Sequence, residues 1–236
     1  MFDIKKCILF EDKDIIVCRK PAGIAVQNAR IGAMDMESSL KNYLSFKSGN
    51  VRNVPYLAVV HRLDQPVEGL LVFARTPQAA AKLSKDLQNG SLKKYYHALV
   101  PLHPALDDQT GHLTDYLLKD GRTNLSRVVS PGNKNAKKAE LDWKFCGQYE
   151  YNGEGYALVE IELFTGRHHQ IRVQMAHAQM PLLGDNKYAS KDSARLSEIT
   201  GICHTALFAS RLILKHPVSG KMLEYTLPFP EEWNIK

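Results

Sequence analysis

Short stretches in which apolar and polar residues alternate recur along this sequence, and a two-residue period predicts β-strands. The clearest stretch is Ala157–Leu163, where Glu160 and Glu162 face away from an apolar row. Ala139–Phe145 precedes it, and the turn residues Asn152–Gly155 lie between them, so we expect the two stretches to pair. The other predicted strands are Ile8–Phe10, Ile15–Cys18, Tyr56–Leu63, Leu70–Ala74, Tyr95–Val100, Leu207–Leu214 and Leu223–Leu227.

Two segments have the period of an amphipathic helix instead. Thr76–Gly90 begins with a capping Thr and a Pro suited to the first turn, and its last residue is a Gly that fits a helix end. His168–Ala178 repeats apolar residues at helical spacing and stops before Pro181. Many strands and few helices, in no regular alternation, predict an α+β fold with a mixed, largely antiparallel sheet and flanking helices.

The length of 236 residues, 44% of them hydrophobic, allows one large domain or two lobes that share a core. No stretch approaches the roughly 18 apolar residues that a membrane helix needs. The charged residues Asp3, Lys5 and Lys6 stand where a signal peptide would be apolar. We therefore expect a cytoplasmic protein without a membrane partner.

The positive charge of the chain is concentrated in one segment. The formal net charge is +6, which alone is weak evidence for a nucleic-acid partner. Lys119–Lys138 has only Asp120 as an acid, and its basic residues are Lys119, Arg122, Arg127, Lys134, Lys137 and Lys138. This segment is either a solvated loop or a surface that binds a polyanion.

Several kinds of site are not expected. Phosphate-binding glycine loops of the Walker or dinucleotide type do not occur. The four cysteines are far apart, without metal-site spacing, and we interpret them as reduced thiols. The adjacent residues His168 and His169 are expected to point in different directions on a helix, so no metal is implied.

Two groups of residues can carry chemistry. His61-Arg62-Leu63-Asp64 follows an apolar stretch and precedes another, so Asp64 would be an exposed carboxylate on a rigid loop. From these residues alone, Asp64 is either a nucleophile or general base, or a loop aspartate that pairs with Arg62. The second group, Thr165–Arg172, places two Arg and two His at a helix start, where they can bind phosphate or simply be solvated.

Together these groups resemble the RluA-like family of RNA pseudouridine synthases. The similarity extends over nearly the whole chain in family order, and this fold would contain a central cleft. The matching segments are Lys20-Pro21-Ala22-Gly23, His61–Asp64 with Gly69-Leu70-Leu71, Lys94–Val100, Thr165–Val173, Pro181–Asp185 with Lys187-Tyr188, and His216-Pro217.

The resemblance implies a role for individual residues. Asp64 would break the uridine glycosidic bond, with Arg172 paired to it, and Arg62 would hold the target nucleotide flipped out. Tyr96 would stack on the uracil, with Ile171 against the base. Extrusion of a base costs a few kcal/mol, and aromatic stacking offsets about 1–3 kcal/mol of it. Further substrate-binding residues are implied on the same grounds: Arg167, His169 and Lys187.

The implied partner is a structured RNA, ribosomal or transfer RNA, with no obligate protein partner. No redox step or external acceptor is involved, so no cofactor is expected. We expect a single catalytic domain over residues 1–236, two lobes sharing one sheet, without an accessory amino-terminal RNA-binding domain. The catalytic domain itself would then supply the affinity, with Arg127, Lys134, Lys137 and Lys138 along the RNA backbone.

The chain departs from its apparent relatives directly after the catalytic loop. Most relatives have Thr-Ser-Gly there, whereas this chain has Val67-Glu68-Gly69. Glu68 also allows a third hypothesis, a hydrolytic nucleosidase that uses Asp64 and Glu68 as a carboxylate pair. The second hypothesis is a catalytically silent RNA-binding relative. The retention of Asp64, Tyr96 and Arg172 favours the enzyme over the silent relative.

Overall fold

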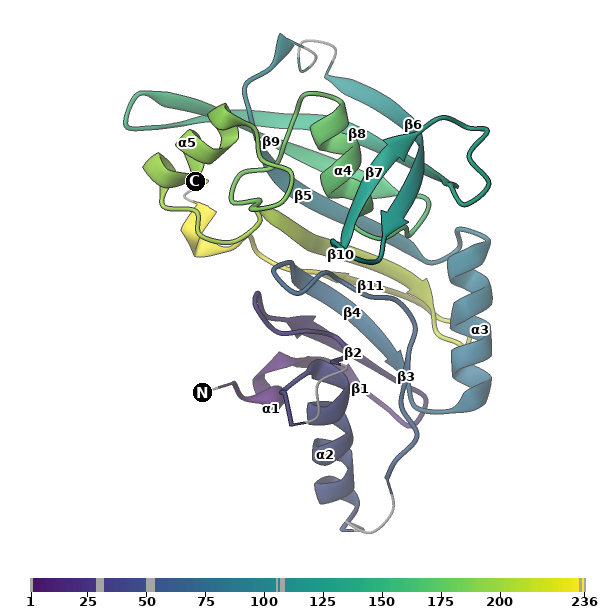
Figure 1. Ribbon diagram of the computed structural model, residues 1–236. Coiled ribbons are helices and arrows are strands. Elements are labelled where there is room, and N and C mark those ends of the chain that lie inside the picture. The colour runs from purple at the N-terminus through teal and green to yellow at the C-terminus, as the bar shows by residue number, and fades with distance from the viewer. Residues whose placement is uncertain are drawn as a thin grey trace. The chain divides into compact units, whose positions relative to one another are not determined.

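The computed structural model describes residues 2–28, 32–49, 54–104, 106, 109–233 and 235. The chain forms two compact units (Figure 1). The amino-terminal unit comprises residues 1–93 and 211–227, and the central unit comprises residues 94–210 and 228–236. Among the described residues, no helix combines the length and apolarity needed to cross a lipid bilayer.

The amino-terminal unit contains antiparallel strands and three helices. Strand β2 pairs with both β1 and β4, β3 pairs with β4, and β10 pairs with β11. The strands are β1 (Ile8–Glu11), β2 (Ile15–Lys20), β3 (Ala58–Val59), β4 (Glu68–Ala74) and β11 (Met222–Thr226), with the second half of β10 (Leu207–Lys215). The helices are α1 (Ile4–Cys7), α2 (Met36–Ser48) and α3 (Pro77–Gln88).

The core of this unit lies between its sheet and α3. Val72 of β4 and Leu83 of α3 are both fully buried within it, together with Ile15 and Leu212. Helix α3 begins where the sequence predicts, because the Thr76 side chain accepts a hydrogen bond from the Ala79 amide. The buried strand β4 is thus a rigid support for the loop that precedes it.

The central unit is built on an antiparallel sheet. Its strands follow the order β5-β9-β8-β6-β7. They are β5 (Lys93–Pro101), β6 (Thr110–Asp120), β7 (Leu125–Val129), β8 (Lys137–Tyr151) and β9 (Glu154–Leu163), with the first half of β10. The other elements are α4 (Gln170–His177), α5 (Lys191–Thr200) and a 3-10 turn, η2 (Glu231–Trp233).

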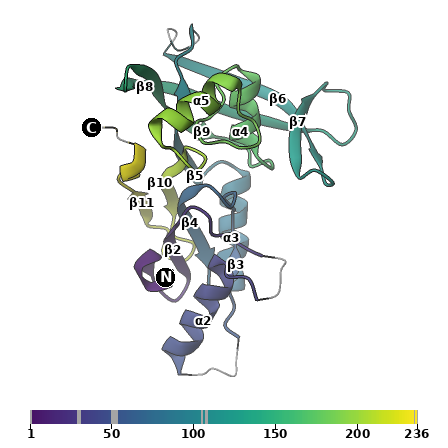
Figure 2. The ribbon, with the colours of Figure 1, turned by 60° about the vertical axis from the view of Figure 1, so that its left-hand side comes forward.

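Helix α4 packs against one face of this sheet, as both views show (Figures 1 and 2). Val173 of α4 forms a buried cluster with Leu117 of β6 and Ala139 of β8, and Val128 and Tyr188 pack against it. Directly paired residues share a face of an antiparallel sheet, and successive residues alternate between faces. Because Ile161 pairs with both Tyr96 and Trp143, these three side chains lie on one face.

The structure confirms the predicted mixed, mostly antiparallel sheet with flanking helices and most of its strands. The prediction of a long strand at Tyr56–Leu63 is wrong, since only Ala58–Val59 pairs with β4. The basic segment Lys119–Lys138 is not a plain loop: it contains the end of β6, all of β7 and the start of β8. Helices α2 and α5 were not predicted from the sequence.

Candidate active site

Asp64 lies on a tight turn between β3 and β4. The Val67 amide donates to the Asp64 carbonyl over 3.0 Å, which closes the turn. The side chains of Leu63 and Val67 are buried on either side of it, whereas Asp64 is half-buried and Arg62 is exposed. Apolar anchors thus fix the backbone of the loop, whereas Asp64 is half-buried and not exposed as the sequence predicted.

A buried ammonium group supports this loop from beneath. Lys20, at the end of β2, is fully buried, and its Nζ donates three hydrogen bonds to backbone carbonyls. The acceptors are the carbonyl oxygens of Pro21 at 2.9 Å, Ile24 at 2.6 Å and Gln65 at 3.0 Å. Because Gln65 directly follows Asp64, Lys20 ties the Asp64 loop to the segment after β2.

Two further bonds join the same segments. The Gly23 amide donates to the Gln65 carbonyl at 2.9 Å, and the Gln65 side-chain amide donates to the Gly23 carbonyl at 3.0 Å. Gly23 has a φ of 81°, a conformation that a residue without a Cβ adopts without strain. The Lys20-Pro21-Ala22-Gly23 segment therefore supports the loop that carries Asp64.

The position of Lys20 also affects its protonation. Burial lowers its pKa to about 8, although the negative charges of Glu68 and Asp64 oppose this shift. The ammonium is therefore held near both carboxylates and remains mostly charged at neutral pH.

Glu68, the unusual residue of the loop, is bound by Arg19. The Arg19 Nε donates to Glu68 Oε1 at 2.5 Å, and an ion pair from the Arg19 Nη2 joins the same oxygen. Arg19 lies on β2 next to Lys20, so this pair spans the two neighbouring strands β2 and β4. Glu68 thus holds the end of the Asp64 loop through its ion pair with Arg19, and this pairing disfavours the nucleosidase hypothesis.

In the central unit, Arg172 is the buried centre of a second arrangement. Only 2% of this residue is exposed, and Asp185 holds its guanidinium through two bonds of 2.7 Å. The ring of Tyr188 lies 5.3 Å from the guanidinium carbon, which is the geometry of a cation–π contact. These partners fix the direction of Arg172, whereas its implied ion pair with Asp64 stays a prediction.

Asp185 is ionised in this setting. Burial by itself raises the pKa of its carboxyl, but the hydrogen bonds and charge of Arg172 and the backbone amides of Lys187 and Tyr188 outweigh burial and lower the pKa. The result is a charge-neutral, bidentate pair inside the protein.

The two adjacent histidines do not diverge on a helix, contrary to the sequence-based expectation. They precede α4, and their rings stack with centroids 3.7 Å apart. His169 has a left-handed backbone with a φ of 54°, and this conformation brings the rings together. His169 is buried, and its Nδ1 lies 2.9 Å from the Tyr188 hydroxyl.

The same tyrosine connects the arginine to the β6–β7 hairpin. The Ser126 amide of β7 donates to the Tyr188 hydroxyl at 2.8 Å, and the Ser126 hydroxyl donates to the His168 carbonyl at 2.8 Å. Lys187, which is exposed, donates from its Nζ to the Asn124 carbonyl in the hairpin turn. A continuous set of contacts therefore links the hairpin to the residues around Arg172.

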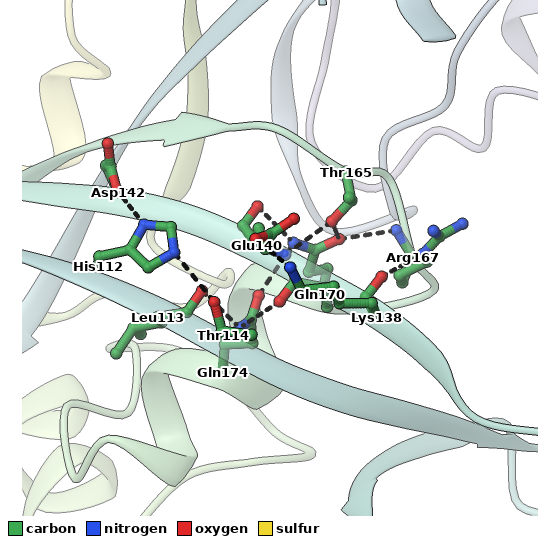
Figure 3. A network of polar contacts seen from close by, with 11 residues as sticks. His112, Leu113, Thr114, Lys138, Glu140, Asp142, Thr165, Arg167, Gln170 and Gln174 are labelled. Atoms are coloured by element: carbon green, nitrogen blue, oxygen red, sulfur yellow. Dashed lines mark hydrogen bonds and ion pairs between the residues drawn. The ribbon is translucent and has the colours of Figure 1, made fainter. Parts of the chain in front are cut away.

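A buried polar network fixes the start of α4 (Figure 3). Gln170 Oε1 accepts hydrogen bonds from the Thr165 hydroxyl at 2.7 Å and from the Arg167 amide at 2.9 Å. The Gln170 Nε2 donates to the Glu140 carbonyl, and the Glu140 amide donates to Thr165 Oγ1. Arg167 is exposed, and its Nε donates to the Lys138 carbonyl at 2.8 Å.

One turn further along the helix, Gln174 extends the network. Its side-chain oxygen accepts from Gln170 Nε2, and its own Nε2 donates to Asp115 Oδ2 at 2.9 Å. These amides attach α4 to β6 and β8 by hydrogen bonds that need one orientation of the helix. Ile171 and Arg172 follow that orientation, and both are buried.

One cluster has the composition of a metal site. Asp12, Asp14 and His216 place possible ligand atoms within 4.8 Å of one another. However, His216 Nδ1 accepts the Ser219 amide at 3.0 Å, so its proton is on Nε2, which donates to Asp12 Oδ2 at 2.8 Å. A metal needs the lone pair of Nε2, so this cluster is a hydrogen-bonded link between two turns.

The architecture is that of solved pseudouridine synthases. The central and amino-terminal segments match a family model described as RNA pseudouridylate synthase over residues 14–177. The fold is similar to two solved human proteins, RNA pseudouridylate synthase domain containing 4 and domain containing 1. The first has a TM-score of 0.74 and is 22% identical; the match covers 96% of this chain and 90% of that protein. The second also has a TM-score of 0.74 and is 20% identical; the match covers 98% of this chain and 86% of that protein.

Curated relatives with similar sequences are also named pseudouridine synthases. Ribosomal large subunit pseudouridine synthase D of Haemophilus influenzae is 32% identical over 96% of this chain and 68% of its own length. The protein of the same name from Zymomonas mobilis is 30% identical over 99% of this chain and 72% of its own length. The chain belongs to the RNA pseudouridylate synthase family. It is an RNA pseudouridine synthase, an isomerase, and the predicted family and reaction class are confirmed.

The structure places the predicted site residues in two groups. The amino-terminal unit holds Arg62 and Asp64. The central unit holds the others, which are Tyr96, Arg167, His169, Ile171, Arg172 and Lys187. Within the central unit, His169, Arg172 and Lys187 are joined through Asp185, Tyr188 and the hairpin, as described above.

Sequence reasoning assigned no role to Lys20, Asp185, Tyr188 or Gln170. All four lie within the segments that resemble the family, and this was the available signal. Lys20 also carries a charge directly after an apolar strand, which is an unusual position for a lysine. Asp185 bonds to Arg172, 13 residues away in sequence, and Lys20 bonds to Gln65, 45 residues away. The spacing of residues along the sequence therefore could not identify these pairs.

Proposed function

We propose that this enzyme converts specific uridines of large-subunit ribosomal RNA to pseudouridine. The support for this RNA is the name of the relatives that are about 30% identical over nearly the whole chain. Transfer RNA is the second candidate, from the resemblance alone. We propose the site residues from their positions in the family motifs and from the hydrogen bonds and burial that hold them in place.

Asp64 is the proposed catalytic residue, and the rigid support of its loop by Lys20 carries the assignment. The bond between ribose C1′ and uracil N1 breaks, the base turns, and C1′ bonds to uracil C5, which then loses its proton. Asp64 serves this exchange either by attack on C1′ or by removal of a ribose proton. Arg172 is proposed to pair with this carboxylate and to hold it in place.

Base flipping requires a site that replaces the stacking partners of the uridine. Tyr96, which is buried on the α4 face of β5, is proposed to stack on the uracil, with Ile171 against the base. Arg62 is exposed on the catalytic loop and is proposed to hold the flipped nucleotide. Arg167 and Lys187 are exposed cations beside the hairpin, where they are proposed to contact the RNA backbone, with His169 as a support below them.

The test uses ribosomal RNA from a strain without this gene, in which pseudouridines are mapped before and after treatment with the purified protein. We expect new pseudouridine at one or a few uridines with wild-type protein and none with Asp64→Asn, whose RNA affinity should stay within a few-fold. Asp142→Asn, an exposed carboxylate on β8, is the matched control and should act like wild type. Retention of a tenth of the activity by Asp64→Asn would contradict the assignment of Asp64, and free uracil would favour a nucleosidase.

A further inference from the structure

Lys94 is a buried lysine without a counter-charge. Only 7% of the residue is exposed, although it carries an ammonium at the end of a long side chain. Among the described residues it has neither a hydrogen bond nor an ion pair, in contrast to Lys20 with its three carbonyl acceptors. Most of the side chain is buried while its Nζ keeps some access to solvent, so the ammonium is partly desolvated and can be reached by an anion from outside.

The position of Lys94 points to the substrate. Lys94 and Tyr96 are two residues apart on β5, so both side chains lie on the α4 face of the sheet. Two residues of a strand span about 6.6 Å. This is comparable with the ribose that separates a base from its own phosphate, and Tyr96 is the proposed stacking partner of the base.

The ammonium also borders the loop before α4. A Cβ built on Gly166 would lie 3.9 Å from Lys94 Nζ, so the nitrogen reaches the backbone of this loop. The next residue, Arg167, is exposed and binds the Lys138 carbonyl through Nε alone. Two cations therefore lie along one loop, and no described carboxylate pairs with Lys94.

We infer that Lys94 is a substrate-binding residue whose ammonium takes a phosphate oxygen of the nucleotide that stacks on Tyr96. This inference rests on the proposed function and deepens it. A phosphate would supply the negative charge that no described carboxylate provides to Lys94. Lysine binds phosphate as a point charge. In the free protein, burial lowers the pKa of Lys94 to about 8, and a bound phosphate would stabilise its charged form.

The experiment is a double-mutant cycle in which RNA affinity is measured with and without the Lys94 ammonium and with and without the phosphate charge. The probes are a short RNA containing the uridine mapped above, and the same RNA with a neutral methylphosphonate at that nucleotide. We expect Lys94→Met to weaken binding of the normal RNA by roughly ten- to a hundredfold. The slope of log affinity against log salt should become shallower by about 0.7–0.9. The methylphosphonate should weaken wild-type binding equally and Lys94→Met binding no further, and Lys94→Arg should recover part of the affinity.

Two comparisons separate this role from others. Lys144→Met is the matched control, because Lys144 is an exposed lysine that pairs with Glu160 on the opposite face of the same sheet. It should leave affinity for both RNAs close to wild type. Thermal unfolding of Lys94→Met should occur at the same or a higher temperature, since the variant loses a partly desolvated charge and no hydrogen bond to the described residues.

Independent losses from Lys94→Met and from the methylphosphonate would overturn the inference, as would an unchanged salt slope. A lower unfolding temperature of Lys94→Met with an unchanged slope would assign the residue a structural role instead. The measurements record binding alone, on the RNA whose uridine the mapping has identified. Failure of the proposed function would appear separately, as absence of pseudouridine with the wild-type protein.

Discussion

Arg172 and Asp185 form a fully buried bidentate ion pair, from Nε to Oδ2 and from Nη2 to Oδ1, with both bonds at 2.7 Å. The pair joins the helix α4 to the segment that leads into Lys187 and Tyr188. Because two parallel bonds fix a planar guanidinium, the arginine cannot turn freely toward or away from its proposed partner Asp64. Asp185 is therefore a positioning residue for Arg172.

Asp185→Asn should lower the free energy of unfolding by about 3–5 kcal/mol, because it leaves Arg172 buried without its counter-charge. Chemical denaturation at pH 7 measures this loss. Asp142→Asn, at an exposed carboxylate that contacts His112, is the control and should change stability little. A similar effect of both substitutions would contradict the assignment.

The same pair predicts a direction of pH dependence. The pKa of Asp185 is lowered in the folded protein, so its stabilising effect is present above the ordinary aspartate pKa of about 3.9. It is lost as the pH falls through the lower folded value. The difference in stability between wild type and Asp185→Asn should thus be constant near neutral pH and shrink in acid.

Tyr188→Phe separates two functions of one side chain. The ring beneath Arg172 remains, but the Ser126 amide loses its acceptor and His169 loses its hydroxyl partner. We expect faster hydrogen exchange of the Ser126 amide and a loss of about 1–3 kcal/mol in stability. Turnover at saturating RNA should persist, since the cation–π contact is kept.

Tyr116→Phe provides the control for this experiment. Tyr116 lies on β6, and its hydroxyl has no hydrogen bond to the described residues. The substitution should leave exchange at Ser126 unchanged. If Tyr188→Phe also left that exchange unchanged, the link between the hairpin and the arginine would not hold.

Lys20→Met should reduce turnover at saturating RNA more than it reduces affinity. Three carbonyls, one of them on Gln65 beside Asp64, lose their donor, and the catalytic loop loses its support. The Gln65 carbonyl keeps the Gly23 amide as a donor, whereas the Pro21 and Ile24 carbonyls lose their Lys20 donor. A carbonyl left unsatisfied costs about 1–3 kcal/mol, so unfolding should also become easier. Single-turnover rates measure the first effect. Lys13→Met, at an exposed lysine of the β1–β2 turn, should reproduce neither effect.

The hairpin predicts a difference between two faces. Lys137 pairs with Leu117 and Lys119 with Ser126, so both lysines lie on the α4 face. Arg127 pairs with Leu118 and Lys138 with Tyr116, on the opposite face. The four residues expected from sequence to follow the RNA backbone therefore form no single row, and Lys138 is already bound to Glu140 at 2.6 Å.

Replacing Lys119 and Lys137 by Met should therefore flatten the slope of log affinity against log salt by about 1.4–1.8, since each phosphate contact contributes about 0.7–0.9. The matched double substitution of Arg127 and Lys138 by Met removes the same charge from the opposite face and should change the slope little. Equal slopes for the two variants would show that the RNA does not distinguish the faces.

The sequence by itself determined the features that depend on local pattern. Alternation in Ala157–Leu163 predicted β9, and the capping Thr76 with the following Pro predicted the start of α3, because period and capping are properties of neighbouring residues. The order of the motifs around Asp64 and Arg172 predicted the family and the reaction, which the comparisons confirmed.

Only the tertiary structure decided what each motif residue contacts. Lys20 supports a loop because β2 ends beside Gln65, whereas Lys94 makes no hydrogen bond to the described residues. Within the basic segment, Ser126 is buried on the α4 face although Lys119, its cross-strand partner, is exposed, and the sequence of the segment does not distinguish the two. The burial of a side chain, its hydrogen-bond partners and the sheet face on which it lies all depend on contacts between residues distant in sequence. No local pattern contains that information.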